Sequence, residues 1–144
     1  MEDPMRTLLP ALMLALDLTA CASQLPAGDE PLTNRYWRVL EINGQPVRGE
    51  NSQAEPHIVL APEHRAHGSD GCNRFTGGYD DAKGLRFSRL ASTMMACPLP
   101  VMQQAQKFME ATTATVNYRI KGKNLELLDA AGRVRMRLEV VFLK

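Results

Sequence analysis

The stretch that decides the fold is VNYRIKGKNLELLDAAGRVRMRLEVVF, residues 116–142. Apolar and polar residues alternate along three segments, separated by turn residues at 122–123 and at 129–132. Because successive side chains of a strand point to opposite faces of a sheet, this period of two predicts three antiparallel strands. The last strand is expected to have one apolar face, made of Val134, Met136, Leu138, Val140 and Phe142.

Segments upstream show the same strand-like pattern. Residues 36–42 are rich in aromatic and β-branched side chains and end at Asn43-Gly44, a dipeptide typical of tight hairpin turns. Apolar residues also occupy alternate positions at 58–60, and again at 85–87 after a turn at 80–84. We expect these segments to be further antiparallel strands.

After the N-terminal region, a single segment has helical spacing. It runs from about Leu99 to Thr113, behind Pro98 and Pro100, which are tolerated at a helix start. The residues at helical spacing are Val101, Ala105, Phe108, Met109 and Thr112. The sequence therefore predicts a mainly β fold with one helix (α+β), in which six to eight strands form a curled antiparallel sheet or partly open β-barrel packed on a single α-helix.

Composition narrows the possible functions. The 144 residues suit one domain, and a formal net charge of +1 with 23% charged residues gives no sign of a nucleic-acid partner. No glycine-rich phosphate loop and no hydrolase elbow occurs, and no nucleophile, base and orienting group can be named together. We therefore expect no enzymatic activity and no cofactor.

The N-terminus has the form of an export signal. Arg6 precedes an apolar run, residues 8–18, that is too short to span a bilayer but has the length of a signal-peptide core. Leu18-Thr19-Ala20-Cys21 then resembles a bacterial lipobox, in which the cysteine is acylated and becomes the mature N-terminus. The alternative is a buried apolar helix whose cysteine is incidental.

These features predict three parts of the chain. Residues 1–20 form a signal peptide, residues 21–33 a lipidated flexible tether, and residues 34–144 the folded domain. The membrane is then a partner through the lipid on Cys21. Ala22 stands where an aspartate would suggest retention in the inner membrane, so the expected location is the cell envelope, lipid-anchored and facing the periplasm from the outer membrane.

Once Cys21 is assigned, two cysteines remain. Cys72 and Cys97 are separated by 25 positions in a chain bound for an oxidising compartment, which predicts a disulfide. A redox-active pair is the alternative, but the usual C-x-x-C spacing is absent.

Two blocks of sequence resemble the signatures of the META domain family, which includes HslJ-like heat-inducible lipoproteins. The blocks are Gly68, Gly71-Cys72-Asn73-Arg74-Phe75, Gly77 and Tyr79, followed by Leu90-Ala91-Ser92-Thr93-Met94-Met95-Ala96-Cys97-Pro98. The resemblance implies a disulfide between the two cysteines and an association with envelope stress or antibiotic tolerance. It brings no catalytic residues.

Other polar residues have both a functional and a structural interpretation. Asn73 and Arg74 are a possible contact surface, although asparagine beside glycines also suits a turn with left-handed backbone geometry. His57, His64, His67 and Asp70 offer metal-ligand chemistry, but histidines three apart on a strand face opposite sides, so solvated or otherwise satisfied histidines are favoured and no metal is expected.

The last strand also carries Arg133, Arg135 and Arg137 on its polar face, with Arg119 and Lys121 expected nearby. These arginines are a possible contact surface for lipid headgroups or an acidic partner, or else a solvated outer face. The leading hypothesis is a non-enzymatic envelope lipoprotein that acts through contacts with an envelope protein or surface component. A periplasmic inhibitor of a lysozyme or protease, and a carrier of a small apolar ligand, are the alternatives.

Overall fold

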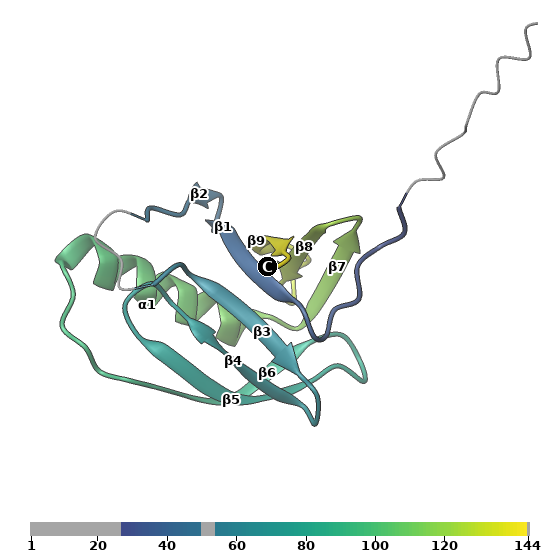
Figure 1. Ribbon diagram of the computed structural model, residues 1–144, viewed down its shortest axis with the longest axis horizontal. Coiled ribbons are helices and arrows are strands. Elements are labelled where there is room, and N and C mark those ends of the chain that lie inside the picture. Colours follow the sequence, from purple (N-terminus) through teal and green to yellow (C-terminus); the bar gives the residue numbers. More distant parts are fainter. Residues whose placement is uncertain (1–26, 50–53, 144) are drawn as a thin grey trace, which may run out of the picture.

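The computed structural model describes residues 27–49 and 54–143 (Figure 1). The predicted signal peptide and the predicted lipidation site, Cys21, lie outside the described residues. In the described part of the chain, no helix has both the length and the apolar character needed to cross a membrane.

One antiparallel sheet of nine strands makes up most of the described structure. Its strands follow the order β6-β5-β4-β3-β1-β9-β8-β7, and the short β2 pairs with the end of β1. The strands are β1 Tyr36–Ile42, β2 Gln45–Pro46, β3 His57–Ala61, β4 Arg65–Ser69, β5 Arg74–Asp80, β6 Arg86–Ser92, β7 Asn117–Lys121, β8 Asn124–Leu128 and β9 Val134–Val141.

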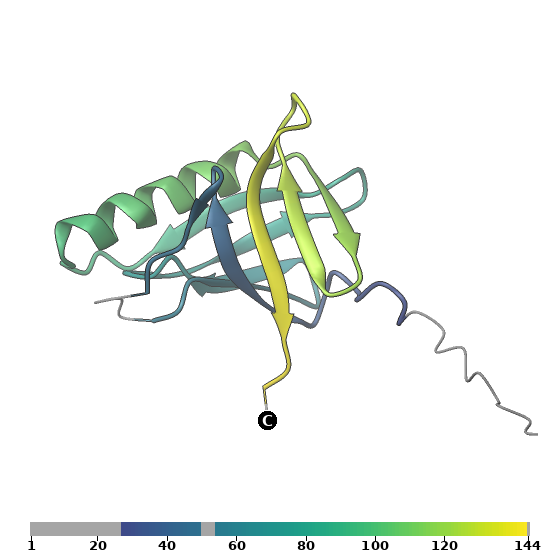
Figure 2. The ribbon, with the colours of Figure 1, turned by 90° about the horizontal axis from the view of Figure 1, so that it is seen from above.

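The sheet curls until its two ends approach each other (Figure 2). Leu85, just before β6, donates its backbone N–H to the carbonyl of Val116, just before β7, at 3.2 Å. This contact requires Gly84, which has φ +85° and whose place for a Cβ lies 2.2 Å from the Val116 oxygen. The sheet is thus a half-barrel whose edge strands meet near one point, which confirms the predicted fold class.

Helix α1, Leu99–Ala114, packs against the sheet and completes the core (Figures 1 and 2). Pro98 is its N-cap residue and Pro100 lies in its first turn, as predicted. Phe108 of the helix and Trp37 of β1 are both fully buried. The ring centroid of Phe108 lies 5.5 Å from that of Phe75 in β5. The helix therefore fills the space inside the curl, and the apolar side chains of both layers exclude water there.

Periodicity predicted the C-terminal strands and β1 well. Tyr36–Ile42 is a strand, and Asn43 and Gly44 follow it with φ of 50° and 77°, as a tight hairpin turn requires. The prediction for Phe142 was wrong, because β9 ends at Val141 and the Phe142 side chain is 57% exposed.

The predicted number of strands, six to eight, was too low. Both β4 and β5 contain glycines, which weaken a strand pattern, yet here glycine is required by close packing. A Cβ on Gly68 would lie 2.1 Å from the His57 carbonyl oxygen of the adjacent strand. Gly68, which belongs to the first signature block, therefore allows β3 and β4 to pair closely.

The folded part also begins earlier than residue 34. Asp29 accepts a hydrogen bond from Gly122 N at 2.7 Å, and Glu30 N donates to Gly122 O at 2.9 Å. Leu32 is buried, and its carbonyl accepts a hydrogen bond from the Trp37 indole at 2.8 Å. Residues from Asp29 onward thus pack on the domain, so the predicted flexible tether does not extend to residue 33.

Candidate functional site

The connection between β6 and α1 carries unusually exposed apolar side chains. Met94 is 98% exposed, Met95 45%, Leu99 68% and Met102 46%. We call these four residues the methionine surface. Scattered exposed apolar residues are ordinary, but these four fall within nine positions, 94–102, that run from the connection into the first turn of α1.

A disulfide joins this connection to the turn before β5. Cys72 and Cys97 are bonded, with their Cα atoms 6.0 Å apart, as the sequence predicted. Cys72 is 2% exposed and packs with Val101 and Ala105 of α1. The bond therefore ties the turn before β5 to the start of the helix.

Asn73 holds the same connection through its side chain. Its Oδ1 accepts hydrogen bonds from the backbone N–H of Met95 at 2.7 Å and from the hydroxyl of Thr93 at 3.1 Å. The Thr93 hydroxyl in turn accepts a hydrogen bond from the backbone N–H of Arg74 at 3.1 Å, and Thr93 N donates to Arg74 O at 3.0 Å. The backbone of the connection is thus fixed at 93, 95 and 97.

The turn that presents Asn73 is itself held by side chains. Asp70 is 2% exposed, and its Oδ1 accepts hydrogen bonds from Cys72 N at 2.9 Å and Asn73 N at 2.6 Å. Ser69 Oγ accepts one from Gly71 N at 3.1 Å. The expected left-handed backbone occurs at Gly71, with φ 100°, and not at Asn73. Asn73 is therefore part of a turn, but it acts through its amide group.

This arrangement combines a backbone held by hydrogen bonds and a disulfide with exposed methionine side chains. Methionine has three rotatable bonds and a polarisable sulfur, so it adapts to many apolar partners. A fixed backbone lowers the entropy that is lost when a partner binds. The chemistry that the methionine surface offers is thus contact with an apolar partner. Sequence reasoning missed it, although the Met94-Met95 pair lies in a signature block and no acidic residue occurs from 82 to 109.

His57 and His67 lie on the paired strands β3 and β4, and His64 lies in the turn between those strands. His57 stacks on the ring of Tyr36, with centroids 4.3 Å apart, and its burial lowers its pKa. His64 lies in the turn before β4 with Nδ1 3.7 Å from an Asp81 oxygen, and His67 is exposed on β4. Throughout residues 27–49 and 54–143 no three His, Cys, Asp or Glu side chains come together as a metal site.

Arg135 and Arg137 lie on the polar face of β9 and Arg133 directly precedes that strand, and all three pair with carboxylates. Arg133 and Arg135 both pair with Asp129, at 2.9 Å and 3.6 Å. Arg137 pairs with Glu126 of β8 and, at 3.3 Å, with Glu41 of β1. Arg119 of β7 also pairs with Glu126, so a ladder of ion pairs crosses β7, β8, β9 and β1. These arginines remain a possible contact surface, but not a concentration of unbalanced charge.

A family model for the META domain matches residues 30–141. The chain belongs to the META domain family. The match spans both signature blocks and ends at the last residue of β9, so it covers nearly all of the fold described above.

Two solved structures share this fold. The NMR structure of a protein from Burkholderia xenovorans is similar with a TM-score of 0.64 and 21% identity, covering 83% of this chain and 93% of that one. A second NMR structure has a TM-score of 0.61 and 22% identity, covering 76% of this chain and 91% of that one. No curated protein matches the chain. These likenesses support the fold of this META domain.

Proposed function

We propose that this META domain is a non-enzymatic envelope lipoprotein that supports envelope integrity or stress and antibiotic tolerance through contacts made by the methionine surface. The observation that carries the proposal is the bracing of a 98% exposed Met94 by the Cys72–Cys97 disulfide and by Asn73. A rigid backbone under exposed apolar side chains suits recognition better than it suits solvation.

Burial of these four apolar side chains can supply enough free energy for binding. Fully burying a methionine or leucine side chain contributes roughly 1.5–3 kcal/mol. Interfaces commonly depend on a few central residues surrounded by contacts that exclude water, and methionine is enriched in interface cores. Four such side chains, two on the connection and two in the first turn of α1, can therefore form the centre of a contact with an envelope protein or surface component.

Attachment to a membrane supports the same function. The lipobox-like sequence ending at Cys21 precedes the folded part by eight positions, at Asp29. An acyl chain contributes about 0.8 kcal/mol per buried CH₂, so a multiply acylated cysteine holds the domain at the bilayer. Such anchoring raises the local concentration of the domain near envelope partners.

A hydrolase inhibitor is the second candidate. An exposed, disulfide-braced segment such as that from Thr93 to Leu99 is the kind of element that can enter an enzyme cleft. The carrier hypothesis finds less support, because Trp37, Phe108 and Leu127 fill the interior of the described half-barrel.

The test is photo-crosslinking in living cells, with a photoreactive amino acid at position 94 and, as a control, at the exposed turn residue Ala131. We expect specific products from position 94 only. Met94→Gln with Met95→Gln should reduce stress tolerance while the fold is retained, whereas replacing His57, His64 and His67 together should leave tolerance nearly intact. Normal tolerance in the folded methionine variant would contradict the proposal. Wild-type protein found in the soluble periplasm would contradict the lipid anchor.

A further inference from the structure

The two halves of the sheet differ in how their arginines are balanced. On β1, β7 and β9, Arg38, Arg119 and Arg137 each contact a carboxylate of a neighbouring strand. The other half carries four exposed arginines, and none of them takes part in an ion pair with any residue that the structure describes. These four are Arg65, Arg74, Arg86 and Arg89.

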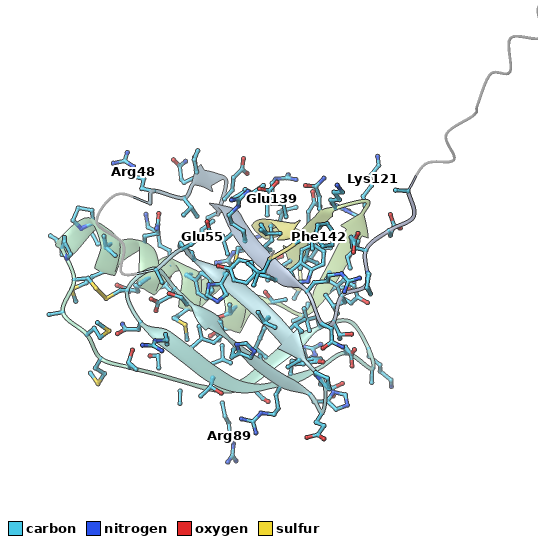
Figure 3. The ribbon with its side chains drawn as sticks, viewed as in Figure 1. Arg48, Glu55, Arg89, Lys121, Glu139 and Phe142 are labelled. Atoms are coloured by element: carbon cyan, nitrogen blue, oxygen red, sulfur yellow. A yellow bond between two sulfur atoms is a disulfide. The ribbon has the colours of Figure 1, made fainter. Side chains whose placement is uncertain are left out.

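The unpaired arginines belong to β4, β5 and β6, which are adjacent in the sheet. Arg74 lies directly beside the methionine surface, because its backbone exchanges hydrogen bonds with Thr93. Arg89 interrupts β6 at a bulge with φ 49°, and Figure 3 shows its side chain pointing away from the sheet into solvent. In the same view Glu55 and Glu139 lie on the opposite side of the molecule.

Basic groups outnumber acidic groups in this region: residues 62–109 contain six lysines and arginines and four aspartates and glutamates, of which Asp70 is buried. Residues 82–109 contain four lysines and arginines and no aspartate or glutamate. On β5, Asp80 lies opposite Arg86 in the strand register, so one of the four arginines has a carboxylate neighbour across the strands. The surface that joins β4–β6 to the start of α1 thus combines exposed apolar side chains with a surplus of positive charge.

We propose that this surface binds an anionic lipid bilayer, with the methionine surface entering the headgroup boundary and Arg65, Arg74 and Arg89 contacting lipid phosphates. The inference rests on the proposed function, and it names an anionic lipid bilayer as the partner of the contact surface. Guanidinium groups match phosphate oxygens in a two-pronged geometry, and each basic residue near an anionic surface strengthens binding by about fivefold.

The shape of the surface favours a bilayer over a protein pocket. Met94 protrudes almost completely, so a soft layer of acyl chains can receive it without a matching cavity. The anchor allows the contact as well. Cys21 and Asp29 are eight positions apart, and an extended chain of that length reaches at most about 28 Å. A tether of this reach lets the domain lie along the bilayer that holds its lipid.

The experiment uses the lipidated protein taken from the envelope and reconstituted in vesicles of phosphatidylcholine, alone or mixed with phosphatidylglycerol. Met94→Trp places a fluorescent reporter on the methionine surface. The native Trp37 is fully buried with its indole N–H bonded to Leu32 O, so its emission gives a constant background. Ala131→Trp supplies a second reporter on an exposed turn away from the surface.

We expect the emission of the Met94→Trp reporter to shift to shorter wavelength and to be quenched by brominated lipid, in anionic vesicles only. The Ala131→Trp reporter should stay in water. Arg74→Gln with Arg89→Gln should reduce the docked-to-free ratio by about 25-fold, at roughly fivefold for each arginine. Arg133→Gln with Arg137→Gln, which removes the same charge from the ion-paired face, should leave that ratio nearly unchanged. Salt at about 1 M should reverse docking, because it screens charges beyond about 3 Å.

Several results would overturn the inference. These are a Met94→Trp reporter that stays in water on anionic vesicles, an equal shift on neutral vesicles, or equal effects of the two arginine pairs. Crosslinking of position 94 to an acidic protein, with no lipid product, would assign the surface to a protein and leave the proposed function standing. Flotation with the vesicles reports the anchor separately, so protein that fails to float contradicts the proposed lipoprotein itself.

Discussion

The side-chain oxygen of Asn73 accepts a hydrogen bond from the backbone N–H of Met95 at 2.7 Å. This contact joins the two signature blocks of the META domain, which the Cys72–Cys97 disulfide also joins. A covalent bond and an amide clamp therefore act on one short connection. The residues that mark the family hold the backbone of the connection, while Met94 remains in solvent.

Asn73→Ala tests the clamp. The change removes the acceptor of the Met95 N–H and of the Thr93 hydroxyl, and a hydrogen bond of this kind typically contributes about 0.5–1.5 kcal/mol to stability. We expect faster hydrogen exchange at the Met95 amide and a lower urea midpoint. Asn73→Asp retains an acceptor oxygen and should lose less stability. Equal losses in the two variants would mean that the acceptor contributes little.

Removal of the disulfide by Cys72→Ala with Cys97→Ala should lower the free energy of unfolding by about 3.5 kcal/mol, on the chain-entropy model for a loop of 25 residues. Denaturation in urea, with and without reductant, measures the effect. Reductant should shift the wild-type curve toward that of the double variant and leave the double variant unchanged. A loss well below about 1 kcal/mol would indicate that the remaining contacts already fix the connection.

Closure of the half-barrel can be tested with two glycines. Gly84 and Gly122 have φ of +85° and +60°, so alanine is strained at both, at roughly 1–2 kcal/mol each. A Cβ at Gly84 would in addition lie 2.2 Å from Val116 O, whereas nothing lies within 4 Å at Gly122. We expect Gly84→Ala to be clearly the more destabilising in thermal melts. Similar melting temperatures would show that the meeting of the two edges adds little to stability.

Asp129 should make stability depend on pH. Hydrogen bonds from the backbone N–H of Arg133, from its guanidinium and from Ala131 N hold the Asp129 pKa below its usual value. The unfolded chain then binds the proton more readily, so this stabilisation is present at neutral pH and is lost as the pH falls through the ordinary aspartate range and below. Asp129→Asn should be less stable at neutral pH and should show a smaller acid-dependent loss. Parallel pH profiles for the two proteins would exclude this role.

Periodicity along the chain determined the elements whose residues pack in a simple alternating or helical pattern. The hairpin after Tyr36–Ile42, the C-terminal strands and the helix from Leu99 all follow from local patterns, because side-chain direction repeats with the backbone period. The cysteine pair was predicted because only two cysteines remain after Cys21, and its bond is present in the structure. The lipidation of Cys21 stays a prediction.

The tertiary structure decided which side chains meet across the strands and which remain in solvent. Arg137 finds Glu126 and Glu41 on two neighbouring strands, whereas Arg89 finds no carboxylate among the described residues, and nothing local distinguishes the two arginines. Met94 is apolar like the core residues, yet the disulfide and Asn73 hold its segment outside the sheet. Strand pairing joins residues far apart in the chain, so charge balance and exposure become defined only when the sheet has closed around its helix.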